Sequence, residues 1–168
     1  GPVMMEGAEG WLHSLQKLEF LSLMGATAGA AAMGRAIMCN GASLLFSREM
    51  FLKTSGYQDK LHFLSGDDVF LLHKFKTICP DRIVFLKSRS AVVTTQAKEG
   101  LKDFFYQRMR WASKTPGYQD RFALLVAVAV ALSNTALLAA WIAMPFGILN
   151  WKVVLAATIM KALPDYLM

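Results

Sequence analysis

The fold of this chain depends most on one uncharged stretch, Phe122-Ala-Leu-Leu-Val-Ala-Val-Ala-Val-Ala-Leu-Ser-Asn-Thr-Ala-Leu-Leu-Ala-Ala-Trp-Ile-Ala-Met144. Asp, Glu, Arg and Lys are absent from residues 122–151. An apolar helix of about 20 residues is long enough to span the hydrocarbon core of a bilayer. We therefore expect a transmembrane helix, with Ser133, Asn134 and Thr135 bonded to their own backbone or facing another helix. The alternative is a fully buried core helix of a soluble protein, although such helices have only about 8–20 residues.

A second apolar stretch runs from Trp151 to Met168. It is interrupted by charged residues and a proline: Lys152, Lys161, Pro164 and Asp165. It would be a poor span by itself, so we expect a truncated second span and a chain that is a fragment of a longer protein.

Much of the positive charge lies before the uncharged stretch. The formal net charge is +6, and the nearest basic residues are Arg82, Lys87, Arg89, Lys98, Lys102, Arg108, Arg110, Lys114 and Arg121. Basic residues that flank a membrane helix favour the cytoplasmic side, and each contributes about 1 kcal/mol to binding of anionic lipid near the surface. The same charge would also suit nucleic acid or a nucleotide diphosphate, so charge does not identify the partner.

The residues before the membrane stretch predict alternating helices and strands. Helices are expected in four segments: Trp11–Ala32 (loosening within Gly25–Gly34), Arg48–Thr54 (capped by Ser47 and ended by Gly56), Val69–Thr77 (capped by Ser65 or Asp67 and stopped before Pro80) and Gly100–Ser113. Strands are expected in three: Ser43–Phe46, Ile83–Leu86 and Ala91–Thr94. This order predicts an α/β unit whose sheet is incomplete within the chain.

Metal-ligating residue types are scattered. The two cysteines, Cys39 and Cys79, match no metal spacing and should be reduced thiols in a cytoplasmic unit. His13, His62 and His73 form no pair with ligand-like spacing. We predict no metal site from these residues.

An acidic pair, Asp67-Asp68, opens the helix predicted from Val69. The dipole at a helix N-terminus stabilises an ionised carboxylate. A carboxylate placed there is ready to accept a proton from a hydroxyl within hydrogen-bond reach. The simpler interpretation is that both acids only cap and solvate the helix.

The segment Gln107-Arg108-Met109-Arg110-Trp111 lies on the amphipathic helix predicted directly before the membrane stretch. Residues at positions i, i+3 and i+4 share a helix face, so Gln107, Arg110 and Trp111 are expected to point the same way. Arg presents a fork of donors suited to phosphate oxygens, and Trp presents a flat apolar face suited to a sugar ring or a base. The alternative is a membrane anchor, with Trp at the headgroups and Arg on lipid phosphate.

A third segment, Cys39-Asn40-Gly41-Ala42-Ser43, consists of small residues before a predicted strand. Small residues allow the backbone to approach a ligand closely. An ordinary packed strand entry explains the same pattern.

Together these three motifs resemble those of family 2 glycosyltransferases, the membrane-associated class that includes cellulose, hyaluronan and ceramide glucosyl synthases. The Cys39–Ser43 segment is similar to the family's small-residue segment near the acceptor. Ser65-Gly66-Asp67-Asp68 is similar to the acidic motif whose last Asp is the general base. Residues 107–111 match the Gln-x-x-Arg-Trp motif, which in the family lies on an interfacial helix before the transmembrane helices. The resemblance covers about residues 1–165.

The resemblance implies transfer of a sugar, with inversion, from a nucleotide-sugar donor to a hydroxyl of a sugar or lipid acceptor. Asp68 would be the catalytic base, with Asp67 as its acidic neighbour, and Gln107 and Arg110 would bind the donor diphosphate. Acceptor binding would fall to Trp111, Cys39, Asn40 and Gly41. It further implies an integral membrane enzyme with a cytoplasmic catalytic face, as in a bacterial inner membrane, and no nucleic-acid partner.

The chain departs from the family in one respect. Family members hold a divalent metal, Mg²⁺ or Mn²⁺, with an Asp-x-Asp motif in an N-terminal half, and this sequence contains no Asp-x-Asp. We therefore expect an α/β fold in which residues 1–99 form the acceptor-side part of a GT-A-like catalytic domain. Residues 100–121 would form the interfacial helix, and 122–168 the transmembrane region. Such a fragment would be inactive alone.

Two other functions are compatible with parts of the sequence. A membrane-anchored scaffold or assembly subunit accounts for the span and its basic flank. A nucleic-acid polymerase is a remote alternative, because Gly66-Asp67-Asp68 is similar to the metal-binding turn of viral RNA polymerases. That turn lies on a hairpin between strands, whereas a helix is predicted after Asp68.

Overall fold

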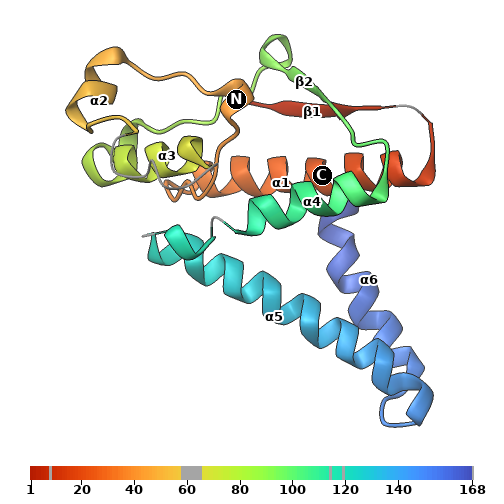
Figure 1. Cartoon of the computed structure of the whole chain (residues 1–168). Helices are drawn as coiled ribbons and strands as arrows, with labels where there is room; N and C mark the ends of the chain where they lie inside the picture. Colours follow the sequence, from red (N-terminus) through yellow and green to blue (C-terminus); the bar gives the residue numbers. More distant parts are fainter. Residues whose placement is uncertain (8, 58–65, 114, 119, 168) are drawn as a thin grey trace. The chain divides into compact units, whose positions relative to one another are not determined.

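The computed structural model describes residues 1–7, 9–57, 66–113, 115–118 and 120–167. Within these residues the chain is mostly helical, and its strands form a single two-stranded sheet (Figure 1). It divides into two compact units, Gly1–Ala123 and Leu124–Met168.

The sheet of the first unit pairs two segments that lie far apart in the sequence. Strand β1 (Val3–Glu6) runs parallel to β2 (Val93–Gln96), with Val3 opposite Val93 and Glu6 opposite Gln96. Side chains alternate along β1: Val3 and Met5 are buried, whereas Met4 and Glu6 are exposed. This alternation is what a strand with one covered face requires. The sequence pattern did not predict β1.

Helix α1 (Trp11–Ala32) packs on the sheet (Figure 1). Its Phe20 forms a small core with Val3 and Met5. Gln16 is fully buried, donates through Nε2 to the carbonyl of Lys98 (2.8 Å) and accepts from the Lys98 N–H (2.9 Å). Because both polar ends of this amide are satisfied, its burial joins α1 firmly to the chain after β2.

Helix α1 confirms its predicted limits, but the expected loosening within Gly25–Gly34 is wrong. The helix continues through the small residues and ends at Ala32, followed by Gly34 with a φ of 68°. Alanines separate the glycines here, and alanine has the highest helix propensity, which offsets the cost of each glycine.

Helix α4 (Leu101–Ala112) confirms the helix predicted before the membrane stretch. One long edge of it faces α1, and Trp111 packs against the Val3–Met5–Phe20 core. In Figure 1, α4 lies alongside α1, with the sheet on the other side of α1. The helix is therefore an integral part of the first unit.

The remaining part of the first unit contains α2 (Arg48–Lys53), α3 (Asp67–Ile78) and short 3-10 turns. Ser47 caps α2 as predicted, through its Oγ and the Met50 N–H (3.2 Å). Helix α3 contributes buried apolar side chains, among them Val69, Phe70, Leu71, Leu72 and Phe75. The short turns are η1 (Gly41–Ser43), η3 (Pro80–Arg82), η4 (Arg89–Ala91) and η5 (Thr115–Gly117).

The predicted cap of α3 needs correction. Gly66 occupies the N-cap with a left-handed φ of 94°, a conformation that glycine adopts without strain. Asp67 is the first helical residue, and Ser65 lies outside the described residues. The helix stops at Ile78 before Pro80, as predicted.

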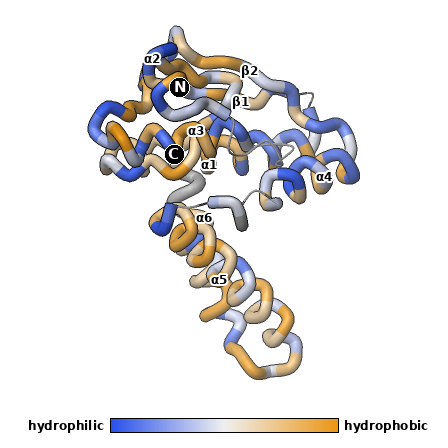
Figure 2. Tube along the Cα trace, turned by 60° about the vertical axis from the view of Figure 1, so that its left-hand side comes forward, coloured by the Kyte–Doolittle hydropathy of each residue, from blue (hydrophilic) through white to orange (hydrophobic). Residues whose placement is uncertain are grey.

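The second unit contains most of α5 (Arg121–Ala143), the turn η6 (Met144–Phe146) and α6 (Trp151–Leu167). Apolar residues predominate along α5 and α6 (Figure 2). The polar side chains predicted to bond to their own backbone do so: Ser133 and Asn134 donate to the carbonyl of Val130, and Thr135 donates to that of Ala131. Contacts between the helices involve Asn134 with Lys161 and Trp141 with Thr158.

The span from Arg121 to Phe146 is long and apolar enough to cross a membrane: an 18-residue stretch within it has a mean hydropathy of 2.2, and only 6% of that stretch is buried. Low burial argues against the alternative of a soluble core helix. The helix therefore indicates membrane association, and no second helix of this kind occurs among the described residues.

The predicted α/β fold with a partial GT-A-like domain is wrong. A two-stranded sheet among helices lacks the alternating strand–helix layers of that class. Two predicted strands, Ser43–Phe46 and Ile83–Leu86, do not form. Ser43 ends the 3-10 turn Gly41–Ser43 and extended chain follows it, whereas Ile83–Leu86 is extended but belongs to no sheet. The third is shifted, because residues 89–91 form a turn and β2 begins at Val93. Strand propensity was present, but a strand also requires a hydrogen-bonded neighbour.

Candidate functional site

The carboxylate of Asp68 is held by two backbone N–H groups of the first unit. Its Oδ2 accepts a hydrogen bond from the Gly41 N–H (2.8 Å), and its Oδ1 accepts one from the Val69 N–H (2.8 Å). Asp68 is partly exposed, while Asp67 beside it is exposed. Two of the sequence motifs, which are separated by 27 positions, thus meet at one carboxylate.

The loop that contains Gly41 is held by a local hydrogen bond. Asn40 accepts a hydrogen bond from the Ala42 N–H through Oδ1 (3.0 Å) and caps the turn η1. A Cβ on Gly41 would lie 3.4 Å from Oδ2 of Asp68. This is an ordinary van der Waals distance, so an alanine at position 41 would still allow the carboxylate to approach the backbone.

Two tyrosines are affected by the charge of this carboxylate. Burial, together with the nearby negative charge of Asp68, raises the pKa of Tyr118. Desolvation, and then Asp67 and Asp68, raises the pKa of Tyr57 as well. Both phenols therefore remain protonated at neutral pH, and a protonated phenol is a hydrogen-bond donor. Neither tyrosine belongs to a sequence motif, and only the fold brings them to Asp68.

His73 lies beneath this region on α3. Its Nε2 contacts the carbonyl of Ile37 (3.1 Å), and its ring meets that of Tyr118 edge-on at 5.2 Å. The other nitrogen, Nδ1, is buried and has no hydrogen-bond partner among the described residues. Burial lowers the pKa of His73, and the ammonium of Lys76 acts in the same direction. The ring is consequently neutral, with the Nε2 proton directed at the carbonyl.

The Gln107–Trp111 segment is held by a different set of contacts. Arg108 forms a forked ion pair with Glu19 of α1, with nitrogen–oxygen distances of 2.6 to 3.0 Å. Its guanidinium also lies over the rings of Phe104 (4.5 Å) and Trp111 (4.3 Å). Trp111 meets Phe20 with ring centroids 6.2 Å apart. These contacts fasten α4 to α1.

Gln107, Arg110 and Trp111, which the spacing predicts to share one helix face, therefore differ in burial and in contacts. Trp111 is half-buried on the core, Gln107 accepts from Arg108 through its Oε1 (2.7 Å), and Arg110 is exposed. The hydrogen bonds described above for Asp68 and Gly41 involve no residue of this segment. The structure brings the first two motifs together at Asp68, whereas Arg108 and Trp111 of the third contact α1.

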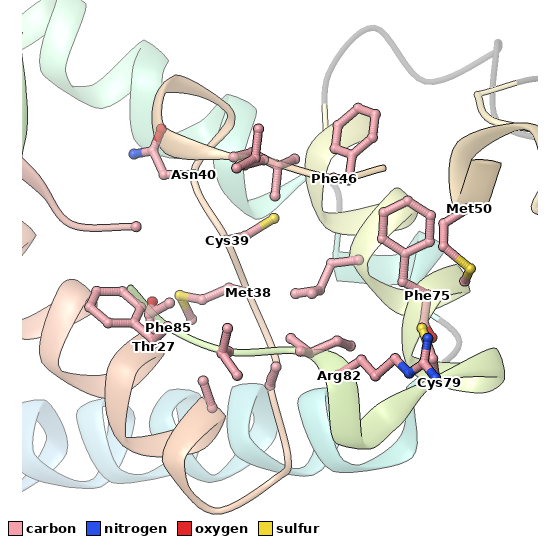
Figure 3. A pocket seen from close by; sticks show the side chains of 18 of the residues that line it. Thr27, Met38, Cys39, Asn40, Phe46, Met50, Phe75, Cys79, Arg82 and Phe85 are labelled. Atoms are coloured by element: carbon pink, nitrogen blue, oxygen red, sulfur yellow. The ribbon is translucent and has the colours of Figure 1, made fainter. Parts of the chain in front are cut away.

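Cys39 and Asn40 line a cavity of about 560 Å³ that is mostly apolar (Figure 3). Phe46 and Phe75 form one end, Thr27 of α1 and Phe85 lie near the other, and Arg82 and Cys79 stand at the rim. An apolar cavity of this size is typical of a binding site for a small molecule or a segment of chain. Cys39 and Cys79 are free thiols.

The start of α5 is anchored by an ion pair. Asp120 bonds to Lys76 of α3 (2.5 Å) and caps α5 by accepting from the Ala123 N–H (2.9 Å). Burial would raise the pKa of Asp120, but the bonds from Lys76 and Ala123 more than offset this and lower it. Lys76 and Arg35 also lie over the ring of Phe122, at 5.9 and 5.1 Å.

Within the described part of the chain, no three His, Cys, Asp or Glu side chains lie close enough to hold a metal ion. No family model, curated protein or solved structure matches this chain.

Sequence reasoning missed Arg108, Glu19 and Tyr118. Arg108 occupies a variable position of the Gln-x-x-Arg-Trp pattern, and its partner Glu19 lies 89 positions away. Local periodicity carries no signal for such a pair. Tyr118 follows the short turn η5, where the sequence alone gave no reason to connect it with Asp68.

Proposed function

We propose that this chain provides the general base of a membrane-associated enzyme that transfers a sugar from a nucleotide-sugar donor to an acceptor hydroxyl. The observation that carries this proposal is the Asp68 carboxylate, which is fixed by the Gly41 N–H at 2.8 Å and remains partly exposed. The resemblance of three motifs to family 2 glycosyltransferases supports the same reaction. The resemblance concerns these motifs and does not extend to the fold.

The geometry at Asp68 suits a base. Each carboxylate oxygen has about two lone-pair positions, and each accepts one backbone N–H here. One position on each oxygen therefore stays open to a hydroxyl proton. Fixing the carboxylate in advance reduces the reorganisation needed when the proton is transferred.

The proposed step is a single displacement. The acceptor oxygen forms a bond to the anomeric carbon while the bond from that carbon to the diphosphate oxygen breaks on the opposite face, which inverts the configuration. The hydroxyl proton passes to Asp68. The raised pKa values of Tyr118 and Tyr57 keep both phenols protonated. The resemblance assigns the donor diphosphate to Arg110 and Gln107, and the hydrogen bonds of Asp68 involve neither residue.

The divalent metal implied by the resemblance would need an Asp-x-Asp motif, which this chain does not contain. No step above passes through a metal. The stacking of an acceptor ring on Trp111 also lacks support from the geometry, because Arg108 lies over that ring and Phe20 adjoins it.

The membrane part of the proposal has support from α5, whose apolar span would keep the site near a bilayer. A cytoplasmic site is proposed from the basic residues that precede it. Nucleotide sugars are made in the cytoplasm of bacteria, so this orientation would give the site access to its donor.

The test is sugar transfer by the full-length protein in native membranes, with a panel of UDP- and GDP-sugars and Mg²⁺ or Mn²⁺. Asp68→Asn keeps an oxygen that accepts from Gly41 but removes the base, so turnover should fall by about 100-fold or more. Donor binding, measured by calorimetry, should survive. The matched control is Asp67→Asn, which changes the exposed neighbour and should retain most activity. Wild-type turnover in Asp68→Asn would remove Asp68 as the base.

A scaffold role is favoured by one observation, namely that Arg108 and Trp111 are engaged in packing. It predicts that no nucleotide sugar binds the full-length protein in the calorimetric measurement. Saturable binding of one member of the panel would exclude a purely structural role.

A further inference from the structure

Two extended segments of the first unit carry the most exposed apolar side chains of the described chain. The exposed fraction of Leu45 is 96%, and that of Val84 is 81%. Both residues line the cavity that also contains Phe46 and Phe85. Isolated exposed apolar residues are ordinary, but two such residues at one cavity form a patch that requires an explanation.

The backbone of these segments is in the strand conformation. Leu44 has φ −120° and ψ 124°, and Ile83 has φ −90° and ψ 116°. Side-chain exposure alternates along 83–86: Ile83 and Phe85 are partly buried, whereas Val84 and Leu86 are exposed. All four are apolar, and strands that are apolar on both faces are typical of sheets covered on both sides.

Most backbone hydrogen-bonding groups of these segments are unused; the Ile83 N–H donates to the carbonyl of Pro80 (3.3 Å), and the Leu86 carbonyl accepts from the Ser88 N–H (3.1 Å). The backbone N–H and C=O groups of Leu44, Leu45, Phe46, Val84 and Phe85 form no hydrogen bond with another described residue. An extended segment with unpaired backbone groups and apolar side chains is a template for another strand. Strand addition uses those groups for affinity and side-chain pockets for selection.

The cavity supplies the side-chain pocket. The cavity is lined by side chains from both segments and from residues 38–40, among them Met38, Cys39, Phe46 and Phe85, which Figure 3 labels. Alternate residues of an added strand would point into this space, and the others would cover Val84.

We propose that the 83–86 segment, together with residues 44–46 at the same cavity, binds an extended polypeptide with alternating apolar side chains, although neither segment belongs to the sheet. The partner adds as a strand, bonding through its backbone and placing every second side chain in the cavity. Backbone pairing distinguishes this partner from an acyl chain or another small apolar molecule, which would fill the cavity without needing the free N–H and C=O groups.

The test uses the full chain in mild detergent and a fluorescein-labelled synthetic peptide, acetyl-Thr-Val-Thr-Val-Thr-Val-amide, with binding followed by fluorescence anisotropy. Two further peptides carry N-methyl groups, one on every Val and one on every Thr. Because a strand bonds to its neighbour through alternate residues, one methylated peptide should lose about tenfold or more in affinity, and the other should lose little. Equal binding of all three peptides would overturn backbone pairing.

Variants locate the binding segment. Val84→Lys and Leu45→Lys place a charge where the added strand would lie, and each should weaken peptide binding by about tenfold. The control is Leu52→Lys on α2, because Leu52 is also exposed (63%) but does not line the cavity. Both classes of variant should keep the wild-type circular dichroism spectrum, since each replaced side chain faces solvent.

Two results would show that the 83–86 segment does not bind an extended peptide specifically. No peptide binding, with self-association that Val84→Lys abolishes, would give the segment to a second copy of this chain. Binding that Leu52→Lys weakens as much as Val84→Lys would show general adhesion to apolar surface. Either result overturns the proposal.

Discussion

Asp68 and Trp111 belong to motifs that the sequence placed in one site, and the structure holds them in opposite ways. Asp68 is fixed by two backbone N–H groups and stays partly open to solvent. Trp111 is packed on Val3, Met5 and Phe20, and its ring is covered by the Arg108 guanidinium. The carboxylate of Asp68 is accessible, whereas the ring of Trp111 is part of the packing of the first unit.

The difference teaches that a motif's residue types do not determine which residues contact a ligand. Asp68 is available because the groups that hold it come from the main chain. Trp111 is engaged because α4 needs an apolar contact to attach to α1, and its neighbour Arg108 adds a forked ion pair to Glu19. Variants that separate stability from chemistry can test this contrast.

The largest effect on stability is expected for Trp111→Ala. Removing a fully buried aromatic side chain costs about 3–5 kcal/mol, and for the half-buried Trp111 we expect about 2–3 kcal/mol. The measurement is guanidinium unfolding of the first unit, followed by circular dichroism of the full chain in detergent. Trp11→Ala is the matched control, because Trp11 is 69% exposed and should change stability little. Equal effects would mean that Trp111 is not a packing residue.

Arg108→Lys should have the next largest effect. Lysine keeps the charge but loses the fork to Glu19 and the planar stacking on Phe104 and Trp111, so we expect a loss of about 1 kcal/mol. A double-mutant cycle with Glu19→Gln isolates the pair. The coupling should shrink at high salt, because Glu19 is 36% exposed. Additive single effects would show that the ion pair contributes nothing.

Local patterns predicted the helices well. The limits of α1, the Ser47 cap of α2 and the existence of α4 and α5 follow from capping residues, periodicity and apolar length. Each of these depends on residues within a few positions of one another. Strands failed for the opposite reason, since Ile83–Leu86 has strand composition but no described neighbour, and β1 pairs with a segment 90 positions away.

The candidate site shows the same limit. The sequence singled out Asp68 and Gly41 separately, but their contact joins positions that are 27 apart in the chain. Tyr118 follows η5 and packs against Phe70 and His73 of α3, which no local pattern predicts. Whether Gln107 and Arg110 bind diphosphate stays a prediction.

Gly41→Pro tests the contact between the two motifs directly. Gly41 is the first residue of η1, where proline is tolerated, and Asn40 before it is already extended, as proline requires. The substitution removes only the N–H that holds Asp68, which should cost about 1 kcal/mol or less because the bond is exposed. Gly41→Ala keeps this N–H and is the control. If transfer activity is established, Gly41→Pro should lower it and Gly41→Ala should not. A proline variant with full activity would make the contact incidental to catalysis.

The smallest effect is a pH dependence that arises beneath the site. Burial holds the pKa of His73 below its unfolded value of 6.5, and Lys76 adds to this, while Asp120 and the Ile37 carbonyl act against it. The unfolded chain therefore binds a proton that the folded chain does not, and stability falls as pH decreases below 6.5. His73→Gln retains a donor for the Ile37 carbonyl and does not titrate, so it should flatten the slope of unfolding free energy between pH 7 and about 5. Asp120 contributes separately, because its lowered pKa gives stability that is lost only as pH falls below 3.8. An unchanged slope in His73→Gln would mean that the fold does not lower the pKa of His73 and that its position beside Tyr118 does not shield it from water.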